Sequence, residues 1–179
     1  MRVIAGTLKG RRIEAPSWPG LRPTSDKLRE TLFNILGPRV VDTHVLDACA
    51  GTGAVGIEAI SRSARHVTFV DRDRRAVDLI AQNLARCAVV DGYALICADL
   101  GSEAHRLRHA TDFDVIFLDP PYDTDATVLA RAVGDRLAAD GVLIIEYARR
   151  TGAPSDIEDL QRTREVTSGD SALGFYVKM

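Results

Sequence analysis

Long apolar runs are missing from this 179-residue chain, and cysteine is scarce. No stretch approaches the ~18 consecutive apolar residues of a membrane-spanning helix, and residues 1–6 lack the apolar core of a secretory signal. Cys49, Cys87 and Cys97 are odd in number and have no C-x-x-C spacing, which argues against a disulfide framework and a zinc site. We therefore expect a cytoplasmic protein without a metal, whose cysteines are small buried or half-buried thiols.

Internal repeats and low-complexity tracts are also absent from the sequence. The chain is 46% hydrophobic and 27% charged, which is ordinary for a globular protein, and its length suffices for a well-formed core. Composition alone therefore predicts a globular protein and leaves its function open.

Charge is unevenly distributed along the chain, although the formal net charge is only −2. Residues 1–39 hold eight Lys and Arg against three acids, whereas the remaining residues hold 15 against 22. A basic segment on an acidic body indicates a polyanionic partner for the amino-terminal part. Solvated surface charge is the alternative interpretation.

From residue 43 onward, short apolar strands alternate with helical patterns, which predicts an α/β fold with a mostly parallel sheet covered on both faces. Helices are indicated by apolar residues at three- and four-residue spacing, including Leu129, Val133 and Leu137. The residues 168–170 predict a hairpin that returns an antiparallel strand to the sheet edge. The expected strands span residues 44–48, 66–71, 93–98, 114–119, 141–147, 160–166 and 172–178.

The first 39 residues are expected to form a basic extension, followed by the main domain over residues 40–179. Residues 2–5 and 11–14 flank a glycine-bounded turn, which predicts a short β-hairpin. A helix follows, with Thr24, Ser25 or Asp26 as its cap and Gly37-Pro38 at its end. Its apolar stripe consists of Leu28, Leu32, Ile35 and Leu36.

The tetrapeptide Asp119-Pro120-Pro121-Tyr122 closes the apolar run of residues 115–118. It is therefore expected at the carboxyl end of a buried strand, where open α/β sheets place their binding sites. An amine attached to a π system offers two in-plane donors, which Asp119 and the Pro120 carbonyl can accept while Tyr122 covers the face. A simple strand end, with Tyr122 capping the core, is the alternative.

A second site is indicated by Gly51, Gly53 and Gly56, which match the G-x-G-x-x-G spacing between a strand and a helix. Asp71 follows Gly51 by twenty residues, at the end of the next strand. This pattern predicts a cofactor that contains a nucleoside. A structural turn is the alternative, since short glycine patterns recur in strand-to-helix connections.

Asp47, just ahead of the glycine loop, would oppose a pyrophosphate but favour a ligand that carries an ammonium and a sulfonium. S-adenosylmethionine is such a ligand. We expect Asp47 to face the ammonium, Asp71 to accept the ribose hydroxyls and Asp99 to meet the adenine amine, although helix capping also explains Asp99. The full predicted cofactor set is Asp47, Ala50, Gly51, Gly53, Asp71, Arg72, Asp99 and Leu100.

The order of the glycine loop, Asp71, Asp99 and the Asp119-Pro120-Pro121-Tyr122 motif along the chain resembles that of a class I S-adenosylmethionine-dependent amino-methyltransferase. The amino-terminal runs, above all Arg29-Glu30-Thr31-Leu32-Phe33-Asn34, are similar to the RsmD family, which methylates a guanine N2 in 16S ribosomal RNA. The resemblance implies a Rossmann-like, seven-stranded, mostly parallel sheet with an antiparallel last strand. It also implies the 30S subunit as partner, with Asp119, Pro120 and Tyr122 as catalytic residues.

A target base must leave its stack to reach such a pocket, and basic side chains would then hold the RNA phosphates. The two acceptors at Asp119 and the Pro120 carbonyl do not by themselves distinguish the amine of a guanine from that of a DNA adenine or a protein glutamine. Two other functions stay open: a nicotinamide-dependent oxidoreductase, which explains neither Asp47 nor the proline pair, and a catalytically inactive RNA-binding protein. The predicted RNA-binding residues are Arg2, Lys9, Arg11, Arg12 and Arg22.

Overall fold

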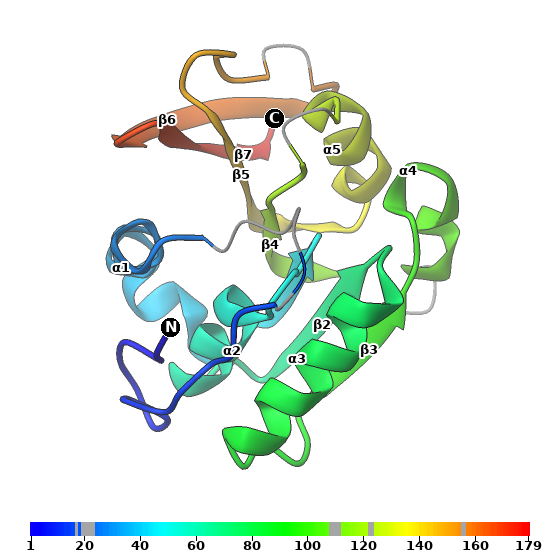
Figure 1. Cartoon of the computed structure of the whole chain (residues 1–179). Coiled ribbons are helices and arrows are strands. Elements are labelled where there is room, and N and C mark those ends of the chain that lie inside the picture. The colour runs from blue at the N-terminus through cyan, green and yellow to red at the C-terminus, as the bar shows by residue number, and fades with distance from the viewer. Residues whose placement is uncertain (17, 19–23, 108–111, 122–123, 155–156) are drawn as a thin grey trace.

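The computed structural model describes residues 1–16, 18, 24–107, 112–121, 124–154 and 157–179. One seven-stranded sheet crosses the molecule, with helices on both faces (Figure 1). The strand order is β3-β2-β1-β4-β5-β7-β6. The strands are β1 (His44–Ala48), β2 (His66–Asp71), β3 (Tyr93–Cys97), β4 (Phe113–Leu118), β5 (Leu137–Ala148), β6 (Leu160–Ser168) and β7 (Ser171–Lys178).

The pairing confirms the predicted sheet, with one correction. β3, β2, β1, β4 and β5 are paired in parallel, whereas β7 is antiparallel to both β5 and β6. The expected hairpin is present, but it returns β7 to a position between β5 and β6, so that β6 forms the edge. Burial explains this order, because β7 is buried over most of its length and β6 is largely exposed.

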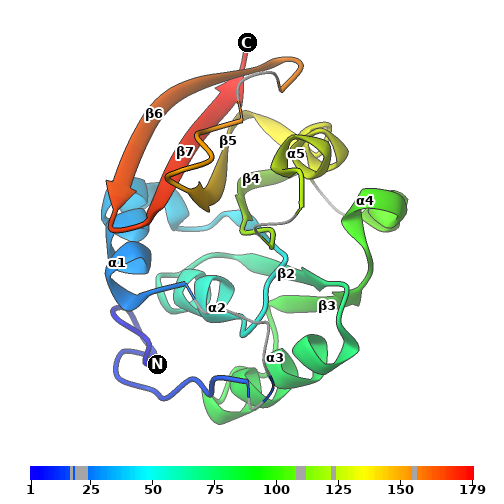
Figure 2. The same ribbon diagram turned by 45° about the horizontal axis from the view of Figure 1, so that its top comes forward.

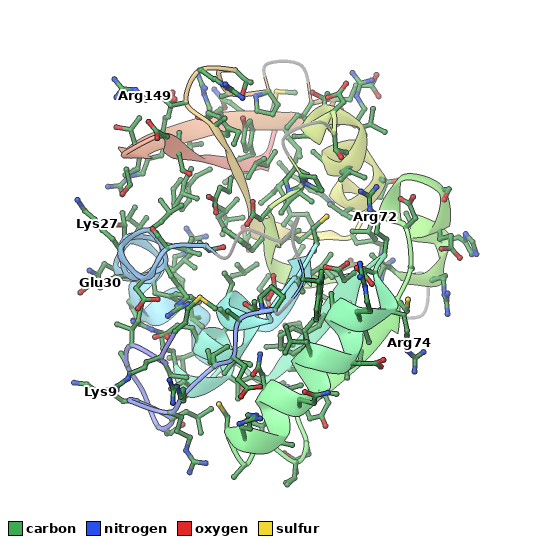
Figure 3. All side chains as sticks on the ribbon, viewed as in Figure 1. Lys9, Lys27, Glu30, Arg72, Arg74 and Arg149 are labelled. Carbon is green, nitrogen blue, oxygen red and sulfur yellow. The ribbon has the colours of Figure 1, made fainter. Side chains whose placement is uncertain are left out.

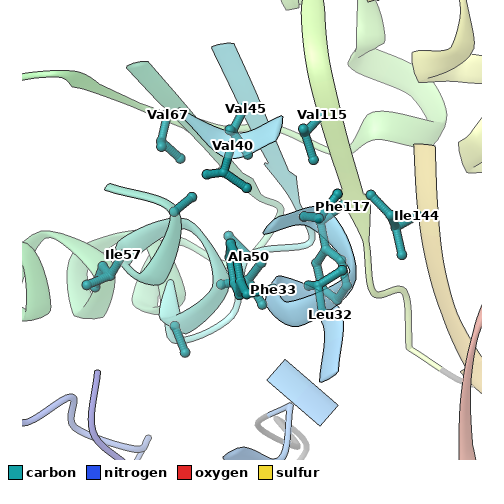
Figure 4. Close-up of a cluster of buried hydrophobic side chains, with 14 of the residues drawn as sticks. Leu32, Phe33, Val40, Val45, Ala50, Ile57, Val67, Val115, Phe117 and Ile144 are labelled. Carbon is teal, nitrogen blue, oxygen red and sulfur yellow. The ribbon is translucent and has the colours of Figure 1, made fainter. Parts of the chain in front are cut away.

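Helices cover the two faces of the sheet unequally (Figure 2). The core on one face combines apolar side chains of α1, α2 and α3 with those of the sheet, and part of it is drawn in Figure 4. The core on the other face combines the sheet with α4, the turn after it and α5. The helices are α1 (Asp26–Leu36), α2 (Ala54–Ser61), α3 (Arg74–Arg86), α4 (Leu100–Glu103) and α5 (Ala126–Gly134), with 3₁₀ turns at Gly37–Val40 and Ala104–Leu107.

One helical assignment from the sequence is wrong. Leu137 continues the spacing of Leu129 and Val133, but α5 ends at Gly134 and Leu137 begins β5. Leu137 is fully buried in the same core as the two helical residues, so that burial satisfies the apolar pattern without a further helical turn. Among the described residues, no helix is both long and apolar enough to cross a bilayer.

The amino-terminal segment is an irregular hairpin. Residues 2 and 12 form a single antiparallel bridge, and the amide of Val3 donates to the Arg11 carbonyl at 2.9 Å. The expected strands are thus reduced to one bridge, but Val3 and Ile13 are buried in the core beneath α1. The boundary proposed after residue 39 stays a prediction.

Glu58 of α2 fastens this segment to the sheet domain. Its carboxylate accepts hydrogen bonds from the amides of Ile4 at 2.7 Å and Ala5 at 3.0 Å, and from Arg62 Nε at 2.8 Å. Arg29 Nε lies 3.8 Å from the same carboxylate, and both side chains are fully buried. Arg29 also donates to the Arg2 carbonyl, so that one buried ion pair connects the first residues, α1 and α2.

Replacing Glu58 by Gln should lower the free energy of unfolding by about 3 kcal/mol, because it removes the buried carboxylate charge that faces Arg29. The remaining ion-pair partner of Arg29 is then Asp26, which lies 3.1 Å away and is 60% exposed. Urea unfolding, followed by circular dichroism, measures this. Asp42→Asn is the matched control, because it breaks an ion pair with Arg65 whose side chains are 67% and 59% exposed, and it should change stability little. Equal, small effects of the two variants would show that the buried pair does not hold the segment.

Candidate active site

A cavity of about 1070 Å³ lies at the carboxyl ends of the parallel strands. Its walls are formed by the connections that follow β1, β2, β3 and β4, together with the start of α1 and the turn between β6 and β7. This is where an open α/β sheet is expected to bind a ligand. The volume is at the upper end of the range for small-molecule sites, which leaves room for two ligands side by side.

The glycine loop after β1 forms one wall of the cavity. Ala50 and Gly51 both line it, as predicted, and Gly51 has a φ of 55°, a backbone conformation that favours glycine. The Ala50 amide donates to the Val70 carbonyl at 2.9 Å, and the Gly53 amide donates to the Ala50 carbonyl at 2.7 Å. These bonds fix the loop against β2 as it enters α2.

Gly53 and Gly56 have structural reasons to be glycine. Gly53 precedes α2 with a φ of 74°, does not line the cavity, and faces Ile80 of α3, whose Cγ2 would lie 3.0 Å from an added Cβ. An added Cβ at Gly56 would lie 2.2 Å from the Phe69 ring. The last glycine therefore permits close packing of the helix on the sheet, the role that it has in dinucleotide-binding folds.

Asp47 lies beneath the loop at the end of β1, lines the cavity and is only 2% exposed. Its Oδ2 accepts a hydrogen bond from the Gly56 amide at 2.8 Å. Burial raises the pKa of Asp47 to about 8; the Gly56 bond opposes this rise and the charge of Asp71 adds to it. A nearby positive charge would favour the ionised form, so that the site is suited to a cation.

Asp71 connects the glycine loop to the turn after β2. Its Oδ2 accepts from the Gly51 amide and its Oδ1 from the Asp73 amide, both at 2.9 Å. A carboxylate has about four acceptor positions, so that two remain for a ligand's hydroxyl groups. The side chain lines the cavity, as the predicted ribose contact requires.

Three carboxylates converge on Cys49, the residue that follows β1. Burial raises the pKa of the Cys49 thiol to about 12, a rise to which the negative charges of Asp71, Asp119 and Asp47 contribute. The thiol is therefore protonated and unsuited to act as a nucleophile. The same negative field fits a ligand with positive charges, such as an ammonium and a sulfonium. All three cysteines are free thiols, buried at Cys87 and half-buried at Cys49 and Cys97.

The predicted adenine end of the site is formed by the connection after β3. Asp99 lines the cavity but also caps α4, because its Oδ1 accepts from the Gly101 amide at 2.9 Å. Both interpretations of Asp99 are therefore compatible with its position. Leu100 is buried and Arg72 is exposed, and both line the same part of the cavity.

Asp119 and the prolines face the cavity from the tip of β4. Asp119 Oδ2 accepts a hydrogen bond from Thr24 Oγ1 at 3.2 Å, which orients the carboxylate. Pro120 is buried and Pro121 exposed, and both line the cavity, as does Asp119. The strand tip therefore shares one cavity with the glycine loop, whereas Tyr122 lies outside the described residues.

Four of the five predicted RNA-binding residues lie together in the amino-terminal hairpin. Arg2, Lys9, Arg11 and Arg12 are all exposed, and Lys9 points away from the body of the protein (Figure 3). Arg11 is also anchored, because its guanidinium donates to the Cys87 carbonyl at 2.7 Å. Arg22 lies outside the described residues.

The hairpin is packed on the end of α2 that is distant from the glycine loop. The Thr7 amide donates to the Ser61 carbonyl and the Leu8 amide to Ser61 Oγ, and Ser61 is the last residue of α2. Because α2 begins at the loop, its eight residues place the tip of the hairpin, at Thr7 and Leu8, about 12 Å from the loop along the helix axis.

Sequence reasoning missed several residues of the cavity wall. The sequence suggests Thr24 only as a cap, but Ser25 caps α1 and Thr24 instead contacts Asp119. Trp18 lines the cavity with Arg75, whose guanidinium lies 5.1 Å from the ring centre. Glu146 of β5 also lines the cavity, and the signal for it in the sequence is that it is the one acid in the apolar run of residues 142–148. The turn at residues 168–171 also lines the cavity.

Comparison with known proteins identifies the family. The family described as conserved hypothetical protein 95 matches residues 1–177. The putative rRNA methyltransferase YlbH of Bacillus subtilis is 36% identical over 182 residues, which cover 99% of each chain. Ribosomal RNA small subunit methyltransferase D of Escherichia coli K12 is 33% identical over 179 residues, which cover 98% of this chain and 89% of the relative.

The fold agrees with this relationship. The structure described as putative methyltransferase yhhF from Escherichia coli superposes with a TM-score of 0.84 at 31% identity, covering 99% of this chain and 97% of the other. The sequence relationship and the shared fold both extend over nearly the full length, including the amino-terminal hairpin. The chain therefore belongs to the family described as conserved hypothetical protein 95, which is the RsmD family of methyltransferases.

Proposed function

We propose that the protein transfers the methyl group of S-adenosylmethionine to the exocyclic N2 amine of a guanine in 16S ribosomal RNA. The observation that carries this proposal is the single cavity that brings an acid-lined glycine loop together with the Asp119-Pro120-Pro121 tip. The relative named ribosomal RNA small subunit methyltransferase D supports ribosomal RNA as the substrate. An assembled or partly assembled 30S subunit, and thus the cytoplasm, belongs to the same proposal.

The residues of the loop side fit S-adenosylmethionine. Asp47 would hold the ammonium, Asp71 the ribose hydroxyls, and Asp99 with Leu100 the adenine. When bound, this cofactor supplies a methyl group on a sulfonium, which is already an excellent leaving group. The protein therefore needs no covalent intermediate, and its contribution is alignment and electrostatics.

On the other side of the cavity, Asp119 and the Pro120 carbonyl would accept the two N–H groups of the target amine. The amine's lone pair is delocalised into the ring, and these hydrogen bonds favour a more tetrahedral nitrogen. They also stabilise the positive charge that develops on the nitrogen as it gains a methyl group, before it loses a proton. Thr24 fixes the orientation of the Asp119 carboxylate for this purpose.

Asp119→Ala tests the reaction directly. Wild-type protein, tritiated cofactor and 30S subunits that lack the modification should give label on a guanine N2, and the variant should lose at least about a hundredfold in rate. Calorimetry should show nearly unchanged affinity for S-adenosylmethionine, because Asp119 lies at the substrate side. A parallel reaction with naked ribosomal RNA shows whether the protein methylates the free RNA or requires the 30S subunit. A variant with near wild-type rate would rule out this role for Asp119.

The raised pKa of Asp47 predicts a pH dependence of cofactor binding. Between about pH 6 and 7.5 the buried acid is mostly protonated, so that a cation must displace its proton, and affinity should rise by up to about tenfold per pH unit. Calorimetry in buffers of different ionisation enthalpy measures the released proton. Asp47→Asn should abolish both the slope and the release; an unchanged slope in this variant would contradict the assignment.

Stability of the ligand-free protein should show the opposite sign. A folded-state pKa of about 8 lies above the unfolded value of about 4, so that the folded protein retains a proton that the unfolded chain loses. The free energy of unfolding should therefore fall as pH rises between these two values. Asp47→Asn, which cannot ionise, serves as the reference in urea unfolding at each pH.

The basic hairpin is the proposed contact for RNA phosphates. Lys9→Glu/Arg12→Glu should weaken RNA binding and flatten its salt dependence by about 0.7 in slope for each phosphate that the variant no longer neutralises. Arg11 is left unchanged because it also anchors the hairpin to Cys87. Arg131→Glu/Arg164→Glu is the control, with the same change of net charge at exposed positions on α5 and β6. Equal effects of the two double variants would exclude the hairpin as a specific clamp.

A further inference from the structure

The cavity has a second carboxylate on its substrate side, Glu146 of β5. Its side chain lines the cavity and the residue is only 6% exposed. The residues around it in β5, from Val142 to Ala148, are otherwise apolar and buried. A carboxylate in the wall of a cavity can accept hydrogen bonds from a bound ligand, which makes Glu146 a candidate contact for the substrate.

Strand register places Glu146 beside Asp119. β4 and β5 are parallel, and Phe117 pairs with Ile144. Asp119 and Glu146 each follow this pair by two residues, so both side chains project from the same face of the sheet. Neighbouring strands are about 4.8 Å apart, which brings the two acids within reach of adjacent atoms of one small ligand.

The start of α1 covers this face of the sheet. Thr24, Ser25 and Lys27 line the cavity here, and Thr24 contacts Asp119. On the far side, the turn at residues 168–171 completes the wall next to β5. The acids proposed for the cofactor lie on the strands and loops at the other end of the same cavity. Glu146 therefore belongs to the compartment for the acceptor base.

Guanine presents a particular row of groups on its Watson–Crick edge. Its N2 amine and its N1–H are adjacent donors, whereas adenine has no donor at position 2 and a lone pair at N1. An ionised carboxylate only accepts hydrogen bonds. A second carboxylate beside Asp119 thus matches the N1–H of guanine and opposes a purine whose N1 is an acceptor.

We propose that Glu146 selects guanine by accepting a hydrogen bond from N1–H while Asp119 and the Pro120 carbonyl accept those of the N2 amine. This inference rests on the proposed function and deepens it, because it assigns the recognition of the base to a residue outside the Asp-Pro-Pro tip. An enzyme that reads an extruded base by its Watson–Crick edge needs such an acceptor at N1. In this role Glu146 contacts the base directly and determines which base is accepted.

The analogue 2-aminopurine separates the two contacts, because it keeps the amine at position 2 and has an acceptor at N1. RNA fragments that carry either guanine or 2-aminopurine at the mapped target position are compared with wild type, Glu146→Gln and Glu30→Gln. Glu30 is an exposed residue of α1 that points away from the protein, and provides the same chemical change as a control (Figure 3). The side-chain amide that Glu146→Gln introduces can donate to the N1 lone pair of the analogue.

Wild type should prefer guanine over 2-aminopurine by about a hundredfold or more in kcat/KM, because the N1 lone pair of the analogue would face the Glu146 carboxylate where guanine presents a donor. Glu146→Gln should reduce this preference at least about tenfold, and Glu30→Gln should behave as wild type. Fluorescence of the 2-aminopurine RNA, titrated in the presence of unreactive S-adenosylhomocysteine, reports binding without methyl transfer. In that assay Glu146→Gln should bind the analogue more tightly than wild type.

Equal reductions on both RNAs in Glu146→Gln, with an unchanged preference, would overturn the inference and indicate a structural role. Wild type itself provides a test that does not depend on folding of the variant: equal use and equal binding of the two RNAs would also overturn it. If wild type methylated guanine at no position of the ribosomal RNA, the proposed function would fail and this inference with it. The first two outcomes leave the proposed function intact.

Discussion

Parallel pairing of β1, β2, β4 and β5 is the constraint on which the site depends. In a parallel sheet the carboxyl ends of neighbouring strands lie at one edge, so that residues far apart in the sequence become neighbours. Here the register aligns Asp47 with Phe117, and Phe117 with Ile144. Two residues further along each strand, the same alignment brings Cys49, Asp119 and Glu146 side by side. The cavity walls are a direct result of this alignment.

The acidic residues at this edge of the sheet accept hydrogen bonds from backbone amides of the glycine loop and of α2. Asp47 accepts from Gly56 and Asp71 accepts from Gly51, so that the carboxylates also hold the loop that leads into α2. The loop geometry and the electrostatic field therefore arise from the same contacts. Before a positive ligand binds, the charge in the cavity is limited by Asp47, because burial raises its pKa to about 8 and keeps it mostly protonated near neutral pH.

Local patterns predicted most of the fold. The apolar run at residues 115–118 and the glycine loop identified β4 and the start of α2, because each pattern is short and bounded by residues that end a strand or require a turn. Three features depended on contacts between distant segments: the place of β7 between β5 and β6, the assignment of Leu137 to β5, and the bond from Thr24 to Asp119. The apolar pattern of a sequence indicates which residues are buried, but it does not indicate which other segment of the chain buries them.

The contact between the amino-terminal hairpin and Ser61 has a consequence for the size of the substrate. If phosphates bind at the hairpin while a base enters the cavity, the α2 helix between them sets a minimum reach for the RNA. A single nucleoside or a very short oligonucleotide would contact only one of the two places at a time. An RNA that extends by several nucleotides beyond the target base can contact both places, so the helix favours longer substrates over a lone nucleotide.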